Sequence, residues 1–219
     1  DMIAVKDNEL VLEAKAIYSV EKFLISRRIM YWQVYLHKTV ICAEEMMIKI
    51  LLRAKELVQE GEDLPCSKSL KYFLKNKISK QDFDKDATNL EKYAAMDDID
   101  IMAAIKQWMH TEDRVLSFLC KSLVNRRLFK IKMQNEAFNQ EYINSKRQAL
   151  MQKHNLSEQE VEKLLIQNDM TIYLYNPKQN KINILFKDGS LQDFAEATDQ
   201  WNLSALGHPV TKHYVCYPK

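Results

Sequence analysis

The side chains best suited to chemistry lie between residues 17 and 57, a stretch without Gly or Pro. Four of them fall at i, i+4, i+8 and i+11, so on a single α-helix they project from one side. They are Arg27, Tyr31, Tyr35 and Lys38, and Arg28 and His37 flank them. Guanidinium, ammonium and phenol groups on one face are typical of a site that reads anions and sugars. The alternative is a solvated basic face with aromatic rings in the core, and spacing alone does not separate the two.

Composition limits the classes of protein to which the chain can belong. Its 219 residues are enough for a substantial core, either as one domain or as a larger and a smaller unit. A hydrophobic fraction of 47% argues against disorder, and a net charge of only +2 argues against a strongly polyanion-binding surface. We therefore expect no strong nucleic-acid binding, and any phosphate recognition must come from local clusters.

The cysteines and the apolar runs indicate a compartment. Cys42, Cys66, Cys120 and Cys216 show no Cys-x-x-Cys spacing, which favours free thiols in a reduced, cytoplasmic protein. No apolar run reaches the roughly 18 residues that a membrane span needs, and the first residues do not resemble a signal peptide. Neither a membrane partner nor export is expected.

The elements that position these groups are mainly helical up to residue 125. Residues 2–15 alternate in polarity and predict a hairpin with its turn at residues 6–8, a beginning that suggests a piece of a longer chain. One long helix is expected to follow over residues 17–57. Shorter helices are predicted at 66–76, twice within 78–109, and at 112–125, with Ser79 and Thr111 as N-caps.

The pattern changes near Arg126. Strands are predicted at 126–133, 171–176, 181–186 and 210–217, helices within 139–167 and at 190–200, and a turn at Asp188-Gly189. Ser157 and Glu160 fit a capping box. The predicted fold is mainly α with a small C-terminal α+β unit: a helical body at residues 1–125, and the α+β unit at 126–219, with a shared interface.

Common catalytic motifs are absent from the sequence. The five histidines occur in no His-Glu-x-x-His or His-Asp pattern, and there is neither a Walker loop nor a Gly-x-Ser-x-Gly elbow. With three glycines in total, a Gly-rich phosphate cradle is excluded. His110-Thr-Glu-Asp113 is the nearest approach to a metal cluster, but its place at a helix junction favours a cap.

Three stretches, SRRIMYWQVYLHKTV, LVNRRLFKIK and NKINILFKDG, occur in that order and together resemble the C-terminal region of HD-domain nucleotide phosphohydrolases. More narrowly, they are similar to a bacterial branch related to the vertebrate SAM-and-HD-domain deoxynucleoside triphosphate triphosphohydrolase. The resemblance covers almost the whole chain. In that family one long helix carries Arg, then Tyr, then His-Lys, and passes from the catalytic pocket to an effector site. The corresponding residues are Arg27, Tyr35, His37 and Lys38.

The resemblance implies a role for each of these positions. Arg27 would contact a substrate triphosphate and Tyr35 its sugar, as substrate-binding residues. The resemblance implies that His37 and Lys38 would instead face the phosphates of an effector nucleotide. Geometry permits this division, because consecutive helical residues diverge by about 100°. Further effector-phosphate contacts are implied for Arg126 and Lys130, which match an Arg-x-x-x-Lys pattern, and for Lys187 on a hairpin.

The sequence also departs from the family. Leu36 stands where the family has a base-contacting Gln, and Arg28 and Arg127 replace Asn residues. The metal-binding His…His-Asp…Asp set would lie upstream of Asp1. No catalytic or metal-ligating residue is therefore assigned, no cofactor is expected in this segment, and a divalent metal is expected in the intact parent protein.

The sequence thus predicts a C-terminal segment of a metal-dependent HD-superfamily phosphohydrolase acting on (deoxy)nucleotide phosphates. Its expected partners are nucleotides and further copies of the chain in a homo-oligomer. The segment alone is expected to be inactive. The alternative is a stand-alone helical interaction or oligomerisation module whose cations serve solubility.

Overall fold

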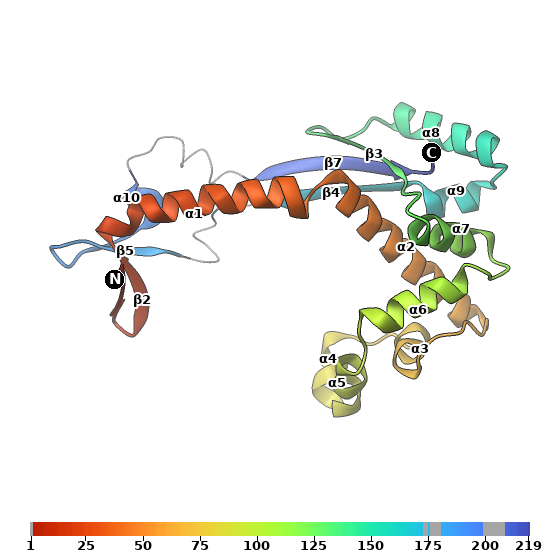
Figure 1. The fold of residues 1–219 in the computed structure, drawn as a ribbon, viewed down its shortest axis with the longest axis horizontal. Helices are drawn as coiled ribbons and strands as arrows, with labels where there is room; N and C mark the ends of the chain where they lie inside the picture. The colour runs from red at the N-terminus through yellow and green to blue at the C-terminus, as the bar shows by residue number, and fades with distance from the viewer. Residues whose placement is uncertain (1, 173–174, 176–180, 199–208) are drawn as a thin grey trace. The chain divides into compact units, whose positions relative to one another are not determined.

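The computed structural model of the chain describes residues 2–172, 175, 181–198 and 209–219. Its contacts divide the chain into two compact units, which are described separately. Unit 1 comprises Asp1–His37, Gln134–Glu136 and Asp169–His213, and unit 2 comprises Lys38–Met133, Ala137–Asn168 and Tyr214–Lys219. Helices predominate over two small sheets (Figure 1). The prediction of a mainly α fold with some β structure is confirmed, while the predicted division at residues 125 and 126 stays a prediction.

Unit 1 begins with the predicted hairpin, formed by β1 (Ile3–Lys6) and β2 (Glu9–Glu13). Lys6 pairs with Glu9, so Asp7 and Asn8 alone form the turn, and both have positive φ (52° and 63°). Two-residue hairpin turns favour this backbone, which Asp and Asn adopt more readily than most residues. The turn predicted at residues 6–8 is therefore confirmed.

The hairpin extends into a four-stranded sheet of order β1-β2-β5-β6. β2 pairs in parallel with β5 (Asn183–Leu185), which pairs antiparallel with β6 (Leu191–Asp193) across the predicted Asp188-Gly189 turn. The prediction of one helix over 190–200 is wrong in its first part, because pairing with β5 makes residues 191–193 a strand. Only the short helix α10 (Phe194–Ala197) follows, and residues 199 and 200 lie outside the described residues.

A small apolar core holds this sheet against the first long helix. After a 3₁₀ turn, η1 (Ala14–Ala16), helix α1 runs over Ile17–Met30. Leu24 of α1 packs in one buried cluster with Tyr175, Ile184 and Phe194. The Tyr175 hydroxyl donates to Asp193 Oδ2 at 2.6 Å and accepts from the Ile182 N–H at 2.9 Å, so the buried phenol is paired on both sides.

The single helix predicted over residues 17–57 is wrong, because the structure interrupts it at Tyr31–His37. A π-helical turn, η2 (Tyr31–Tyr35), follows α1, and the Leu36 N–H donates to the Tyr31 carbonyl at 2.7 Å. Leu36 then leaves helical geometry, with φ −109° and ψ 22°. Tyr, Trp and Val in this turn are weaker helix formers than Arg, Met, Leu or Lys, which favours a break here.

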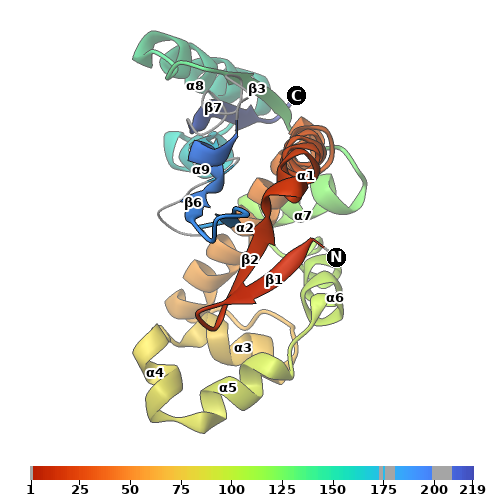
Figure 2. The same cartoon turned by 90° about the vertical axis from the view of Figure 1, so that its left-hand side faces the viewer.

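Unit 2 is built on the second half of that stretch, the amphipathic helix α2 (Lys38–Glu60), which ends where Gly61 takes a φ of 106°. Met46, Ile50 and Ala54 are fully buried along one face, and α2 packs against α3 and α7. Figure 2 shows the helices that follow α2. They are α3 (Lys68–Lys75), α4 (Lys80–Lys85), α5 (Ala87–Ala94), α6 (Asp98–Trp108) and α7 (Arg114–Val124).

The caps of these helices correct two predictions. Residues 78–109 carry three helices rather than two, because Asp86 caps α5 by accepting from the Thr88 N–H and so separates it from α4. Ser79 does precede α4 as predicted. The N-cap of α7 is Asp113 instead of Thr111, since Asp113 Oδ1 accepts from the Leu116 N–H at 2.7 Å. The reading of His110–Asp113 as a cap is thereby confirmed.

The remaining strands and helices follow α7. Strands β3 (Lys130–Gln134), β4 (Ile166–Ile172) and β7 (Val210–Tyr217) form a sheet of order β3-β7-β4. Helices α8 (Gln140–His154) and α9 (Glu158–Leu164) lie between β3 and β4 in sequence, and the Ser157–Glu160 capping box opens α9 as predicted. The strand predicted at 171–176 begins earlier, and its residues 173, 174 and 176 lie outside the description.

A buried carboxylate of α2 is paired within unit 2. Glu45 of α2, 7% exposed, accepts hydrogen bonds from the Tyr214 hydroxyl at 2.6 Å and from Asn168 Nδ2 at 3.0 Å. The four cysteines are free thiols, as predicted. Burial raises the pKa of Cys120 to about 12. In the described part of the chain, no helix combines the length and apolar character required to cross a membrane.

Asp113 is expected to be the most sensitive cap in unit 2. It joins its capping bond to an ion pair with Arg53 Nη2 at 2.8 Å, and both side chains are less than one-fifth exposed. We expect Asp113→Ala to lower the free energy of unfolding by about 1–3 kcal/mol. Asp113→Asn should lose less, because Asn retains the cap. Urea denaturation measures both, with the exposed Asp84→Ala as the control.

The effect should depend on pH in a defined direction. Burial of Asp113 acts to raise its pKa, but the bonds from Arg53 and from the Leu116 N–H outweigh burial and hold the pKa below its ordinary value. A lowered native pKa stabilises the fold above the unfolded value of about 3.9, and that stability is lost as the pH falls through the native pKa. An equal Asp113→Ala effect at neutral pH and below pH ~3 would contradict this account.

Candidate functional site

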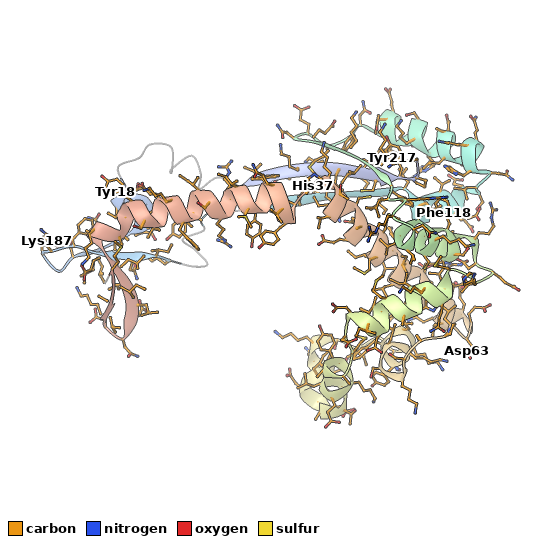
Figure 3. All side chains as sticks on the ribbon, viewed as in Figure 1. Tyr18, His37, Asp63, Phe118, Lys187 and Tyr217 are labelled. Atoms are coloured by element: carbon orange, nitrogen blue, oxygen red, sulfur yellow. The ribbon has the colours of Figure 1, made fainter. Side chains whose placement is uncertain are left out.

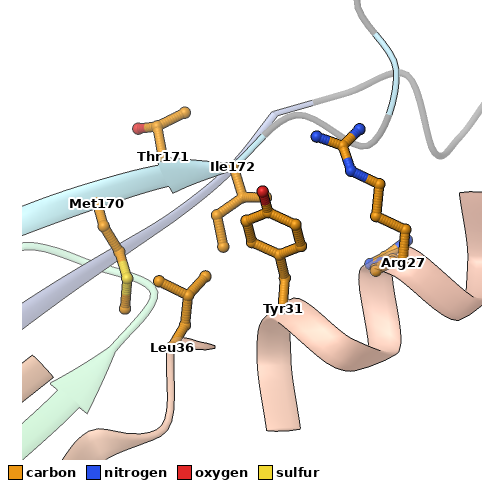
Figure 4. A pocket seen from close by; sticks show the side chains of 7 residues that line it. Arg27, Tyr31, Leu36, Met170, Thr171 and Ile172 are labelled. Carbon is orange, nitrogen blue, oxygen red and sulfur yellow. The ribbon is translucent and has the colours of Figure 1, made fainter. Parts of the chain in front are cut away.

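Unit 1 contains a hollow of about 330 Å³ beside the end of α1 (Figure 4). Two segments that are far apart in sequence form it: the end of α1 with the turn that follows, and the last residues of β4. The lining residues are Arg27, Arg28, Tyr31, Leu36, Met170, Thr171 and Ile172. The floor is apolar and the rim carries two guanidinium groups, so the hollow offers a hydrophobic surface next to positive charge.

The interruption of the helix builds one side of this hollow. Tyr31 opens the π-helical turn and Leu36 closes it, and the bond between the Leu36 N–H and the Tyr31 carbonyl brings both residues to the same hollow. In an uninterrupted α-helix, residues five apart would diverge by about 140° and would not share a face. The break is therefore part of the site.

Arg27 is held over an aromatic face. Its guanidinium lies 5.3 Å from the centre of the Tyr31 ring, and the Tyr31 ring packs against Tyr35 at 5.2 Å between centres with a 58° tilt. Cation–π contact of this kind orients a guanidinium while leaving its N–H groups available to an anion. Among the described residues, no Asp or Glu lines the hollow and none forms an ion pair with Arg27 or Arg28.

The four-residue stripe expected on one helix does not form. Arg27 and Tyr31 lie together, but Tyr35 is 54% exposed and is not among the described residues that line the hollow. Lys38 begins α2 and belongs to unit 2. The stripe ends at Tyr35, whose ring still packs on Tyr31, because the non-helical Leu36 interrupts the helix before Lys38.

The residues assigned to effector phosphates are divided between the units. His37 and Lys187 are exposed residues of unit 1. His37 lies beyond the C-terminal end of α1, whereas Lys187, in the turn between β5 and β6, lies near its N-terminal end (Figure 3). A helix of 14 residues separates them, a span of about 21 Å, so the structure does not bring these two side chains together within one chain.

Unit 2 contains the other effector candidates. Arg126 lies just past the end of α7 and has a positive φ of 56°. It lines a hollow of about 600 Å³ with Lys121, Arg127 and His154. Lys130 lines a second hollow of about 530 Å³, and the two share Pro218 and Lys219. Lys38 is exposed and is not among the described residues lining either hollow. Arg126 and Lys130 thus occupy adjoining basic hollows, as their spacing in sequence allows.

Several lining residues were not found from the sequence. Met170, Thr171 and Ile172 reach the unit 1 hollow from a strand whose extent was misjudged, and pattern analysis carries no signal for such a long-range contact. Lys146 and Lys153, which line a hollow in unit 2, did leave a signal. They lie seven residues apart on one predicted helix and therefore on one face of it.

Comparison with known proteins finds a family match that includes part of the unit 1 hollow. Residues 1–65, which include Arg27, Tyr31 and Leu36, match the family described as "HD associated region". A phosphohydrolase from Bacteroides thetaiotaomicron, solved by crystallography, is 39% identical, with a TM-score of 0.88 over 100% of this chain and 54% of that one. These two matches support a relation of the chain to HD-type proteins.

Two further matches are more distant. The uncharacterized protein YwfO of Bacillus subtilis (strain 168) is 32% identical over 124 residues, which are 57% of this chain and 27% of YwfO. A solved hypothetical protein from Aquifex aeolicus matches 99% of this chain and 46% of its own with a TM-score of 0.56. At 19% identity, that likeness shows the fold alone. The chain thus spans about half the length of its solved relatives.

The described residues offer no metal-ligand cluster. No group of three or more His, Cys, Asp or Glu side chains among them is arranged to hold a metal ion. The donor sets that divalent metals require are clusters of this kind. Arg27 with Arg28, and the basic hollows of unit 2, are instead suited to anions.

Proposed function

We propose that this chain is the C-terminal part of an HD-type phosphohydrolase that acts on nucleotide phosphates. The observation that carries the proposal is the unit 1 hollow, where Arg27 and Arg28 stand over an apolar floor without an acidic neighbour among the described lining residues. Four of its seven lining residues fall within the HD-associated region. The 39% identical relative is named a phosphohydrolase, and its match extends over the whole of this chain.

In this proposal Arg27 binds the phosphate chain of the substrate. A guanidinium presents its N–H groups as a planar fork and can donate two hydrogen bonds to one phosphate. The Tyr31 ring beside the Arg27 guanidinium limits the motion of that side chain. Tyr35, which packs on Tyr31, would meet the sugar through its hydroxyl. These groups bind and orient a substrate, and none of them is proposed to act as the base or nucleophile.

Bond cleavage is not assigned to residues of this chain. HD-type hydrolysis is expected to use a divalent metal in the intact protein, but the described residues offer no ligand set for one. No step is therefore derived through a metal. In this proposal the chain's own part in the reaction is to position the substrate phosphates and to select the substrate by its sugar.

An effector site is a further part of the proposal. Arg126 and Lys130 lie in adjoining basic hollows of unit 2, and Lys38 is an exposed cation of the same unit. His37 and Lys187 belong to unit 1 and lie apart from each other. A nucleotide that used all five would have to draw on more than one chain, which agrees with the expected homo-oligomer.

A second candidate function is assembly without catalysis. Helix α1 exposes Phe23 (65%), Ile29 (48%) and Met30 (46%), and the hairpin exposes Val5 (70%) and Leu10 (76%). Side chains of this size on one unit are typical of surfaces that another protein covers. Catalysis in the full-length protein separates the two functions, because an assembly module would have none.

The substrate role of Arg27 is tested in the full-length protein. We expect Arg27→Gln to reduce kcat/KM for a nucleoside triphosphate by roughly 10- to 150-fold, since a charge-assisted bond to phosphate is worth about 1.5–3 kcal/mol. Lys22→Gln removes the same charge from an exposed position of α1 and should leave kcat/KM unchanged. Equal kinetics for the two variants would show that Arg27 is a solvated surface residue.

The sugar contact is tested separately with Tyr35→Phe, which removes only a hydroxyl group. If that group pairs with the substrate sugar, turnover should fall by the equivalent of about 1–3 kcal/mol, while oligomeric state stays unchanged. Tyr18→Phe, at an exposed tyrosine of α1, is the matched control. Full activity of Tyr35→Phe would remove Tyr35 from the site.

The effector role predicts the opposite pattern. Lys38→Ala combined with Arg126→Ala should weaken activation or oligomerisation by added nucleotide and leave basal hydrolysis intact, because neither residue lines the unit 1 hollow. Steady-state kinetics and light scattering, with and without nucleotide, measure both. A normal response to nucleotide in this variant would contradict the effector site.

A further inference from the structure

Beyond Lys130, the second hollow of unit 2 is lined by residues to which the proposed function gives no role. It encloses about 530 Å³ between β3, α8 and the end of β7. The lining residues are Lys130, Lys146, Ala149, Leu150, Lys153, Tyr217, Pro218 and Lys219. Four of these eight carry an ammonium group, and among the described residues no Asp or Glu side chain lines the hollow.

The floor of the hollow is part of a packed core. Leu150 and Tyr217 are 4% and 8% exposed and belong to one buried cluster with Val161 and Val215. Tyr217, labelled in Figure 3, lies under Lys146, whose ammonium is 5.3 Å from the centre of the ring. Because core side chains are held in place by close packing, the hollow keeps its shape without a ligand.

The lysines are not neutralised by neighbouring carboxylates. The ion pairs of the described residues include none of Lys130, Lys146 and Lys153. The nearby phenol of Tyr142 does not supply a negative charge either, since burial and a bond with Tyr217 raise its pKa to about 12. Lys132 and Lys146 both lie against the Tyr142 ring, at 4.4 Å and 5.3 Å. Ammonium groups gathered in this way repel one another and attract an anion.

The spacing of the lysines indicates what kind of anion fits. Lys146 and Lys153 lie two turns apart on α8, about 10 Å along its axis, and Lys130 approaches from β3. A single phosphate ion cannot contact all of these ammonium groups unless the flexible lysine side chains fold together around it. A chain of linked phosphates can, and lysines serve such chains as separate point charges.

We propose that this hollow binds an oligophosphate, a chain of three or more linked phosphates, either free or as the 5′ group of a nucleoside triphosphate. Lys146 and Lys153 are its principal ligands, and Lys130 is the one residue that it shares with the effector set. The site does not depend on the proposed hydrolysis. It differs from the unit 1 hollow in being lined by lysines instead of arginines.

The test is a calorimetric titration of the chain with inorganic tripolyphosphate at physiological ionic strength. We expect saturable binding, and an affinity for orthophosphate weaker by about tenfold or more. Lys146→Gln with Lys153→Gln should weaken tripolyphosphate binding by about tenfold or more. The control is Lys77→Gln with Lys106→Gln, which removes the same charge from exposed positions of unit 2. A parallel titration with a non-hydrolysable nucleoside triphosphate distinguishes the free chain from the nucleotide as the preferred form.

Each contrary result overturns the proposal. Equal affinity for orthophosphate and tripolyphosphate would show a site for one phosphate, and equal weakening in the control pair would show non-specific attraction. Unchanged binding in the double variant would place the anion elsewhere. If the double variant fails to fold, as judged by circular dichroism, Lys153→Gln alone answers the question, because Lys153 is exposed. None of these titrations involves turnover, so their failure is distinct from a failure of the Arg27 assay.

Discussion

The hydrogen bond from the Leu36 N–H to the Tyr31 carbonyl decides where the functional groups of unit 1 lie. It closes a π-helical turn, ends the first long helix, and brings Tyr31 and Leu36 to one hollow under the Arg27 guanidinium. Lys38, three residues beyond Tyr35, begins a separate helix in unit 2. π-Helical turns are rare and recur at functional sites, because they rotate side chains that a regular helix would direct elsewhere. Here the π-helical turn replaces one continuous helix face with a hollow that Tyr31 and Leu36 both line.

Basic side chains line hollows in both units, and unit 2 also shows how carboxylates are used elsewhere. Carboxylates are used in structural pairs, such as Asp113 with Arg53, and Glu45 is buried under Tyr214 and Asn168. The cations that line the hollows have no ion pair among the described residues. A chain with a net charge of only +2 thereby acquires local positive potential, because no Asp or Glu side chain is among the described residues that line these hollows. Net charge is therefore a poor guide to the local potential of this chain.

Local signals predicted much of the fold. The hairpin turn at Asp7 and Asn8 and the Ser157–Glu160 capping box both follow from residues adjacent in sequence. The failures are positions where a distant partner decides. Residues 191–193 form a strand because β5 is there to pair with them, and Asp113 is paired with Arg53, sixty residues away. The break at Tyr31 left a weaker trace, a run of aromatic and β-branched residues in a long helix.

The same distinction explains the candidate site. Arg27 could be singled out from its type and its neighbours, and the structure adds the aromatic ring that orients it. The strand that completes the hollow comes from residues 170–172, which no periodicity links to α1. In unit 2, Lys146 and Lys153 share a helix face, but their meaning depends on Tyr217 and Lys130, which reach the hollow from β7 and β3. A basic helix face is suited to bind an anion when an uncharged, packed floor lies beneath it. On that side the floor offers the lysine ammonium groups neither water nor a carboxylate as a partner. That condition is met by the buried Leu150 and Tyr217, and it separates this lysine pair from the solvated basic faces that most helices carry.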